Sequence, residues 1–274
     1  MMDPGTNNPL RVMYLSPVGW DGYDKVFADA IDEVRSAGTE VHVTSLSPEL
    51  GRFRHIEFRS YEAMVTSGII RAARVAGREG FDALAIGCFY DTALHDAREL
   101  SGDMVVTAPC TAALDIAASL SNRFGIIVGR QKWVNQMHET VVANGMGEKL
   151  AGFYSVGLGV NEFQRDHART NALLEKAGRR AVEEDCAEAI ILGCTLELGF
   201  HVALSEQLGV PVIDPALAAY HRAEYGALLK RQHGWKPSRK WSCEPPPEEE
   251  LAEIGVFDGD DVFGSRIVLD ARPS

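Results

Sequence analysis

Two cysteines stand at equivalent places in two similar segments, each directly after a glycine. Residues 81–89 read FDALAIGCF and residues 187–195 read AEAIILGCT, so Cys88 and Cys194 both follow an acidic residue, an apolar run and glycine. A proline that suits the first position of a helix follows each cysteine after 21 residues. This internal repeat predicts two thiols that act as a pair.

Inversion at a carbon acid is the chemistry that suits two facing thiols. One thiolate removes a proton from one face of the carbon, and the opposite thiol protonates the other face. Two thiolates close together would repel, so the pair titrates as a unit. Each thiol is expected beside N–H groups at a helix start, which favour a thiolate. We therefore expect the free-cysteine pKa of about 8.5 to fall enough for one thiolate to form near neutral pH.

The other three of the five cysteines are weaker candidates for the site. Cys110, at the start of a predicted helix, is a weaker candidate for lining the site, Cys186 is expected to pack, and Cys243 is expected to be incidental. No pair has CxxC spacing, and free thiols fit a reducing cytoplasm. GxGxxG, GK[ST] and HExxH motifs are missing, so neither a cofactor nor a metal is predicted.

Short apolar strands alternate with helices along most of the chain. Strands are predicted at residues 11–15, 40–46, 83–87, 104–107, 123–128, 152–156, 188–192 and 210–213. Helices are predicted at residues 24–37 (ended by Gly38), 61–79, 92–100, 109–121, 132–144, 161–185, 196–208 and 215–232. Such alternation indicates parallel sheets covered on both faces. The predicted fold is α/β, with two pseudo-symmetric βα lobes and the active site in the cleft between them, because ligands bind at the carboxyl ends of such strands.

The repeat also predicts how the chain is divided. Residues 10–108 and 215–232 would form the first lobe, and residues 109–214 the second. Residues 233–274 are too polar for a third lobe. They are expected to form an arm on the first lobe or on a neighbouring subunit, with disorder as the alternative for parts of it.

Composition excludes several classes of protein. Apolar residues make up 46% of the 274 residues, as in ordinary globular proteins and unlike disordered or fibrous ones. The net charge of −12 argues against binding nucleic acid or an anionic membrane. No apolar run reaches the roughly 18 residues of a membrane span, and the polar start has no secretory signal. We therefore expect a cytoplasmic protein with a small-molecule substrate.

The paired Gly-Cys segments and the βα repeat resemble the aspartate/glutamate/hydantoin racemase superfamily over about residues 10–232. Residues 87–91 (GCFYD) resemble the GCFxD segment of its hydantoin racemase branch. Residues 129–133 (GRQKW) resemble that branch's loop after the first strand of the second lobe, and residues 53–57 (FRHIE) its loop before the second helix. The resemblance implies a cofactor-independent racemase that forms a homo-oligomer.

Carried over by position, the resemblance makes Cys88 and Cys194 the catalytic acid/base pair. The substrate-binding residues that it implies are Ser16, Phe89, Gly129, Arg130, Gln131 and Thr195. Two departures are visible: residues 15–17 read LSP where the family commonly has Asn-Pro-Asn or Asp-Ser, and no histidine follows Thr195 as it does in amino-acid racemases. The missing histidine points away from aspartate or glutamate and toward a hydantoin-type substrate.

Four more polar residues enter the prediction. Asp91 is expected to cap the helix that begins at Thr92, with a place in the site as the alternative. Arg130 would bind a substrate carbonyl or carboxylate through its forked guanidinium, and Gln131 an imide, with an exposed surface position as the equal alternative for both. His55 is the best candidate for a further polar group at the site.

Three kinds of function stay open at this point. The first is a racemase or epimerase of a 5-substituted hydantoin, or of a related carbon acid such as allantoin or an amino acid. The second is a maleate-type cis-trans isomerase or an arylmalonate-type decarboxylase, of which the decarboxylase needs only one protonating thiol. The third is a non-catalytic binding or accessory protein that shares the fold.

Overall fold

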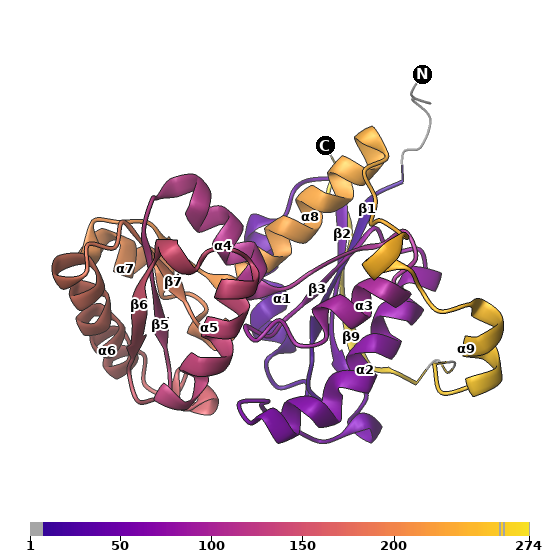
Figure 1. The fold of residues 1–274 in the computed structure, drawn as a ribbon, viewed down its shortest axis with the longest axis horizontal. Coiled ribbons are helices and arrows are strands. Elements are labelled where there is room, and N and C mark those ends of the chain that lie inside the picture. The colour runs from indigo at the N-terminus through magenta and orange to yellow at the C-terminus, as the bar shows by residue number, and fades with distance from the viewer. Residues whose placement is uncertain (1–7, 258, 260, 274) are drawn as a thin grey trace.

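The computed structural model describes residues 8–257, 259 and 261–273, and their strands form two sheets (Figure 1). The first sheet has the order β4-β3-β1-β2-β9 and the second the order β6-β5-β7-β8. The strands of the first sheet are β1 (Leu10–Ser16), β2 (Thr39–Leu46), β3 (Ala83–Ile86), β4 (Val105–Thr107) and β9 (Phe263–Leu269). The strands of the second sheet are β5 (Phe124–Val128), β6 (Leu150–Ser155), β7 (Ala189–Leu192) and β8 (Val212–Ile213).

The second sheet repeats the first. Read in one direction, the first four strands lie in the order β4-β3-β1-β2, and the next four lie in the matching order β8-β7-β5-β6. All neighbours within these two sets are parallel. Even single hydrogen bonds recur, because the Gly87 N–H donates to the Leu15 carbonyl and the Gly193 N–H to the Ile127 carbonyl, each at 2.7 Å. The predicted α/β class with two pseudo-symmetric lobes is confirmed.

Two helices are exchanged between the lobes. The helices are α1 (Asp24–Val34), α2 (Arg59–Arg78), α3 (Leu94–Leu100), α4 (Pro109–Leu120), α5 (Val134–Ala143), α6 (His167–Arg179), α7 (His201–Leu208), α8 (Pro215–His233) and α9 (Glu248–Ile254). Helix α4 follows β4 but packs on β7 and β8, whereas α8 follows β8 but packs on β1, β3 and β4. The two helices also pack against each other between the sheets (Figure 1). One hydrophobic core therefore joins Tyr14, Phe124 and Tyr220 from both lobes.

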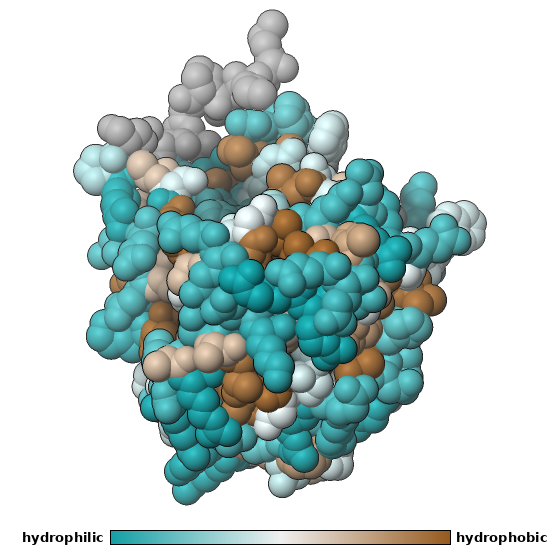
Figure 2. Space-filling view, turned by 90° about the vertical axis from the view of Figure 1, so that its left-hand side faces the viewer, coloured by the Kyte–Doolittle hydropathy of each residue, from teal (hydrophilic) through white to brown (hydrophobic). Residues whose placement is uncertain are grey.

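Other helices cover the outer faces of the sheets. Ile69 of α2 packs beneath the first sheet, and Leu174 of α6 and Leu204 of α7 pack on the second. Figure 2 shows the outer face of the second lobe, which is largely hydrophilic with small separate apolar patches. Within the described part of the chain, none of the helices combines the length and apolar character needed to cross a membrane.

The segment after α8 packs on the first lobe, one of the two partners expected for it. Strand β9 pairs antiparallel with β2 and extends the first sheet. Glu248 at the start of α9 accepts two hydrogen bonds from the buried Arg74 guanidinium of α2, at 2.7 and 2.9 Å. This arm is therefore structured over β9 and α9, and it covers the outer edge of β2.

Some predicted boundaries were wrong because distant residues intervene. Helix α1 ends at Val34, and Gly38 does not cap it but lies with φ 80° in the turn before β2. Arg35 leaves the helix in an extended conformation, and its guanidinium donates to the Thr39 and Asp270 carbonyls at 2.7 Å each. The helix predicted over residues 161–185 is shorter, because regular α-helix is confined to α6 and a π-helical turn follows at Arg180–Glu184.

Candidate active site

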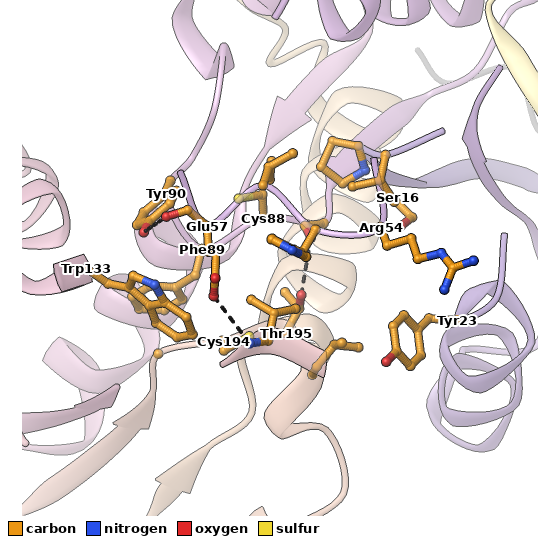
Figure 3. Close-up of a pocket in the computed structure, with 18 of the residues that line it drawn as sticks. Ser16, Tyr23, Arg54, Glu57, Cys88, Phe89, Tyr90, Trp133, Cys194 and Thr195 are labelled. Carbon is orange, nitrogen blue, oxygen red and sulfur yellow. Dashed lines mark hydrogen bonds between the residues drawn. The ribbon is translucent and has the colours of Figure 1, made fainter. Parts of the chain in front are cut away.

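A cavity lies where the two lobes meet, and both cysteines of the repeat line it (Figure 3). Its walls come from the segments after β1, β3 and β7, from residues 54–57 before α2, and from Trp133 and Met137 near the start of α5. Its volume is about 80 Å³, which suits a small molecule. Among the described residues, no group of three or more His, Cys, Asp or Glu side chains is arranged to hold a metal ion.

The glycine before each cysteine is required by a close backbone contact. A Cβ atom at Gly193 would lie 2.5 Å from the Ile127 carbonyl oxygen, and one at Gly87 would lie 3.0 Å from the Leu15 carbonyl oxygen. Real Cβ atoms avoid contacts this short. Glycine therefore lets each strand end against its neighbour, and the following cysteine is placed at the carboxyl end of the sheet.

Cys88 lies beside a polar side chain of the first lobe. The Thr92 hydroxyl is 3.6 Å from its Sγ and 2.8 Å from a carboxyl oxygen of Glu62. Burial raises the pKa of Cys88 from 9.0 to about 12, and the Thr92 hydroxyl and the Tyr90 N–H oppose this rise. Burial therefore favours the thiol form of Cys88 over the thiolate.

Cys194 is enclosed more completely, with 8% of its surface exposed. Burial raises its pKa well above 9.0, the negative charge of Glu197 adds to the rise, and the Leu196 N–H opposes it. The expectation that helix ends lower the thiol pKa was wrong. Helix α3 begins only at Leu94, and Cys194 precedes a single 3-10 turn, Thr195–Glu197, so desolvation outweighs the few N–H groups present.

A hydrogen bond joins the two cysteine segments across the lobes. The Thr195 hydroxyl, directly after Cys194, donates to the carbonyl of Gly87, directly before Cys88, at 3.2 Å (Figure 3). Both ends of this bond are buried. It holds the two segments at a fixed separation and places one thiol on each wall of the cavity.

Residues 23–223 match the family model described as Asp/Glu/Hydantoin racemase. The chain belongs to this family. The hydantoin racemase of Paenarthrobacter aurescens is 33% identical over 242 residues, which cover 88% of this chain and 99% of that protein. The hydantoin racemase of Pseudomonas sp. (strain NS671) is also 33% identical, over 69% of this chain and 75% of that protein. The protein is thus a racemase, an enzyme of the isomerase class.

Solved structures share the fold of this racemase. Allantoin racemase from Klebsiella pneumoniae has a TM-score of 0.78 at 24% identity, covering 87% of this chain and 94% of that one. A variant of arylmalonate decarboxylase and the maleate isomerase of Pseudomonas putida S16 each have a TM-score of 0.59, at 20% and 13% identity. They cover 80% and 79% of this chain, and each matches 92% of the other chain. At these identities the likeness concerns the fold alone.

The predicted substrate-binding residues of the racemase fall into two groups. Ser16, Phe89 and Thr195 line the cavity together with both cysteines. Gly129, Arg130 and Gln131 lie outside the lining.

Each residue of the second group has a different surrounding. Gly129 is buried beside Trp133, and its carbonyl accepts from the Gly157 N–H. The Arg130 side chain is 42% exposed, and its guanidinium donates to the Glu57 carboxylate at 3.0 Å. Gln131 is exposed. Their contact with substrate stays a prediction.

Several residues in the cavity wall of the racemase were not singled out from the sequence. Tyr23 and Phe27 come from the start of α1, and Met137 comes from α5. Their spacing on amphipathic helices is that of ordinary core residues, so the sequence carries no separate signal for them. His55, which was singled out, lines the cavity, and its Nδ1 has no hydrogen-bond partner among the described residues.

Asp91 does cap a helix, but a different one from that predicted. Helix α3 starts at Leu94 rather than Thr92, and Asp91 itself has φ 54°. Its carboxylate accepts from the N–H groups of Cys110 and Thr111 at 2.8 Å each, and from the Thr111 hydroxyl at 2.7 Å. Asp91 thus caps α4, the helix that crosses to the second sheet.

The structure agrees only in part with the predictions for the other three cysteines. Cys110 is fully buried in α4 and does not line the cavity. Cys186 is exposed with φ 56°, so the prediction that it packs was wrong, because the chain turns outward there between the π-helical turn and β7. Cys243 is exposed in the arm, as an incidental residue would be.

Proposed function

We propose that this racemase inverts a 5-substituted hydantoin, with Cys88 and Cys194 as its acid/base pair and without a cofactor. The observation that carries the proposal is that one cysteine from each lobe lines a single cavity, at equivalent ends of two repeated strands. The Thr195–Gly87 hydrogen bond supports it, because it fixes the distance between the cysteine segments.

The proposed reaction conserves protons. One sulfur enters as thiolate and takes the proton from C5 of the ring, leaving an enolate. The opposite sulfur enters as thiol and gives its proton to the other face of the same carbon. The enzyme then holds the same single proton on the other cysteine. The cycle uses one thiolate, so the pair must ionise once to enter it. Burial raises the pKa of both thiols and opposes this ionisation, so a second one is strongly disfavoured.

The cavity wall favours a neutral ring over an amino acid. Phe27, Phe89, Trp133 and Met137 make much of it apolar. The buried indole N–H of Trp133 has no partner within the described residues and is free to donate to a carbonyl of the substrate. The charged residues Arg54 and Glu57 also line the cavity, so the preference for a neutral ring rests on these apolar side chains and on the neutral indole donor. The similarity to two hydantoin racemases supports the same choice.

The test follows loss of the C5–H or Cα–H signal by proton NMR in D₂O. The panel contains D- and L-hydantoins with benzyl and isopropyl substituents, allantoin, aspartate, glutamate, an arylmalonate and maleate. Exchange of hydantoins that is abolished in Cys88→Ser and in Cys194→Ser is the expected result. Exchange confined to an amino acid, conversion of maleate, or loss of CO₂ from the arylmalonate would each overturn the hydantoin proposal. No reaction across the panel would favour a binding protein.

We also propose that the racemase works as a homo-oligomer in the cytoplasm. The family resemblance supports the first part, and the need for two free thiols supports a reducing compartment. Light scattering on the purified full chain would reveal a mass that is a multiple of the 29.9 kDa chain. A monomer at working concentration would contradict the first part.

A further inference from the structure

Arg54 places a positive charge in the cavity wall that the reaction above does not use. It belongs to the segment before α2, lines the cavity and is an exposed residue. Its guanidinium makes no hydrogen bond or ion pair with any residue that the structure describes. It lies over the Trp20 ring, 5.4 Å from the ring centre. A guanidinium that stacks on an aromatic ring keeps its N–H groups available to a ligand.

The acidic side chain of the same wall, in contrast, has partners. The Glu57 carboxylate accepts from the Arg130 guanidinium at 3.0 Å and from the Val160 N–H at 3.5 Å. Both donors belong to the second lobe, so Glu57 joins the two lobes. Of the two charged residues Arg54 and Glu57, only Arg54 lacks a partner within the described part of the chain.

The surroundings of Arg54 hold it in place. The ring of Phe53, directly before it, packs on the ring of Tyr61 in α2 with the ring centres 4.9 Å apart. The ring of His55, directly after it, packs on the same tyrosine at 5.8 Å. Arg54 therefore extends from a segment that is anchored on both sides, toward the Trp20 ring.

A second arginine acts at this end of the cavity from the other lobe. Tyr23 lines the cavity, and its hydroxyl lies 3.5 Å from the side-chain oxygen of Asn161 in the second lobe. Burial raises the pKa of Tyr23, and the positive charge of Arg165 opposes this rise. The Arg165 guanidinium also makes no hydrogen bond or ion pair with the described residues. Both lobes thus bring unpaired positive charge to this end, although the net charge of the protein is −12.

The place of Arg54 relative to the cysteines indicates which part of a substrate it would meet. Figure 3 shows Trp133 on one side of the two cysteines and Arg54 with Tyr23 on the other. The proposed reaction holds C5 of the hydantoin between the two sulfurs. At C5 of the enolate, the ring and the substituent point in opposite directions. With the ring carbonyl on the Trp133 indole, the substituent therefore points toward Arg54.

We propose that Arg54 is a specificity-determining residue that binds an anionic group at the end of the 5-substituent, so that the enzyme prefers hydantoins with a carboxyalkyl side chain. This inference rests on the proposed function, because it takes the hydantoin ring as the part held between the cysteines. The forked guanidinium offers two parallel N–H groups that match a carboxylate. The reversed orientation is disfavoured, because it would bring the carboxylate of the substrate toward Glu57.

The experiment compares two hydantoins of nearly equal shape that differ in charge. They are 5-(2-carboxyethyl)hydantoin and its neutral amide, 5-(2-carbamoylethyl)hydantoin. Chiral chromatography of single enantiomers gives kcat/KM for each, at low and at high salt. The proteins are the wild type, Arg54→Gln, Arg54→Lys, and Arg52→Gln as a matched control at an exposed arginine that does not line the cavity.

The wild type should prefer the carboxylate over the amide. Arg54→Gln should lower kcat/KM for the carboxylate about tenfold, as the loss of a hydrogen bond between charged groups would, and leave the amide within about twofold. Arg54→Lys should keep part of the preference, and Arg52→Gln should keep all of it. High salt should reduce the preference of the wild type, because the pair is exposed. Preference for the amide in the wild type, or an equal loss on both hydantoins in Arg54→Gln, would overturn the proposal.

Binding calorimetry separates this proposal from the proposed function. Both hydantoins are used as racemic mixtures, so that racemisation produces no net change. The carboxylate should bind more tightly than the amide to the wild type, and equally to Arg54→Gln. This preference in binding without turnover would refute the hydantoin racemase and leave Arg54 as the residue that binds the anion. Turnover without the preference would keep the racemase and refute the role of Arg54, and no binding of either hydantoin would refute both.

Discussion

The segments after Cys88 and after Cys194 begin from the same backbone geometry and diverge within three residues. In the first, Asp91 turns away from the cysteine and satisfies two N–H groups and a hydroxyl of α4. In the second, Asp214 already caps α8, and the buried Glu197 carboxyl accepts no hydrogen bond from the residues that the structure describes. The repeat thus places an acidic residue three positions after each cysteine. Whether its carboxyl group caps a helix depends on whether another residue already caps that helix.

The same divergence makes the two thiols unequal. The Thr92 hydroxyl lies 3.6 Å from the Cys88 sulfur, and the charges of Glu62 and Asp91 raise the pKa of Cys88, whereas Glu197 is the first of the charges that raise the pKa of Cys194. If the two thiols were equivalent, each would be deprotonated equally often. Each prediction below tests one part of the difference between the two segments.

Removal of either sulfur should have the largest effect. We expect Cys88→Ser and Cys194→Ser each to lower kcat/KM for racemisation by about 10³-fold, because each removes one partner of the proton transfer. Chiral chromatography of the product measures the loss. Cys243→Ser, at an exposed site in the arm, should be unchanged. A single variant that keeps most of the activity would refute the pair and favour a one-thiol mechanism.

Replacing the glycine before each cysteine by alanine should destabilise the protein more at Gly193 than at Gly87. We expect Gly193→Ala to lower the free energy of unfolding by about 3 kcal/mol and Gly87→Ala by about 1 kcal/mol. The added methyl would meet the Ile127 carbonyl oxygen at 2.5 Å in the first variant and the Leu15 carbonyl oxygen at 3.0 Å in the second. Urea unfolding measures both. Equal losses would mean that the two strand ends are equally tight.

Cutting the link between the cysteine segments should have an intermediate effect. Thr195→Val keeps the side-chain shape but loses the hydrogen bond to the Gly87 carbonyl. We expect kcat/KM to fall about tenfold, the equivalent of one lost buried hydrogen bond, with a larger change in kcat than in KM. Thr140→Val on α5 serves as the control. An unchanged kcat would show that the two segments keep their separation without this bond.

The smallest expected effect is a change of stability with pH. Burial raises the pKa of Asp91 from 3.8 to about 6, so the folded state binds its proton more tightly than the unfolded state. Stability from this group is therefore present at pH 4 to 5 and is lost as the pH rises through 6, by about 1 kcal/mol between pH 5 and pH 7.

Asp91→Asn should remove that part of the pH dependence. Denaturant unfolding at pH 5 and pH 7 compares the two proteins. Asp24, whose pKa burial also raises to about 6, leaves a similar dependence in both. Equal slopes for wild type and variant would mean that Asp91 keeps its proton affinity unchanged on folding.

Much of the fold follows from local pattern. Glycine before each cysteine, proline at the starts of α4 and α8, and short apolar strands place the parallel sheets and bring Cys88 and Cys194 to one cavity. These features depend on residues close together in the chain, and repeated features reinforce each other.

What the sequence missed depends on contacts between distant residues. The helix capped by Asp91 lies about 20 residues away, and Arg35 ends α1 by reaching the carbonyl of Asp270. The hydrogen bond between Arg130 and Glu57 likewise joins residues 73 positions apart. The thiol pKa was misjudged for the same reason, because burial comes from the assembled walls and not from the short turn that follows each cysteine.

The exchange of α4 and α8 has a consequence for how the nascent chain folds on the ribosome. Strands β1 to β4 are synthesised first, but α8, which covers one face of their sheet, follows only after the whole second sheet. On the order of 100 residues separate β4 from α8, or about 5 to 20 s of synthesis at common rates. Through that interval the part of the apolar face around Tyr14 that α8 covers lies open, although α1 already packs against Tyr14 through Phe27. The emerging first lobe therefore exposes the kind of apolar surface that favours aggregation until α8 arrives.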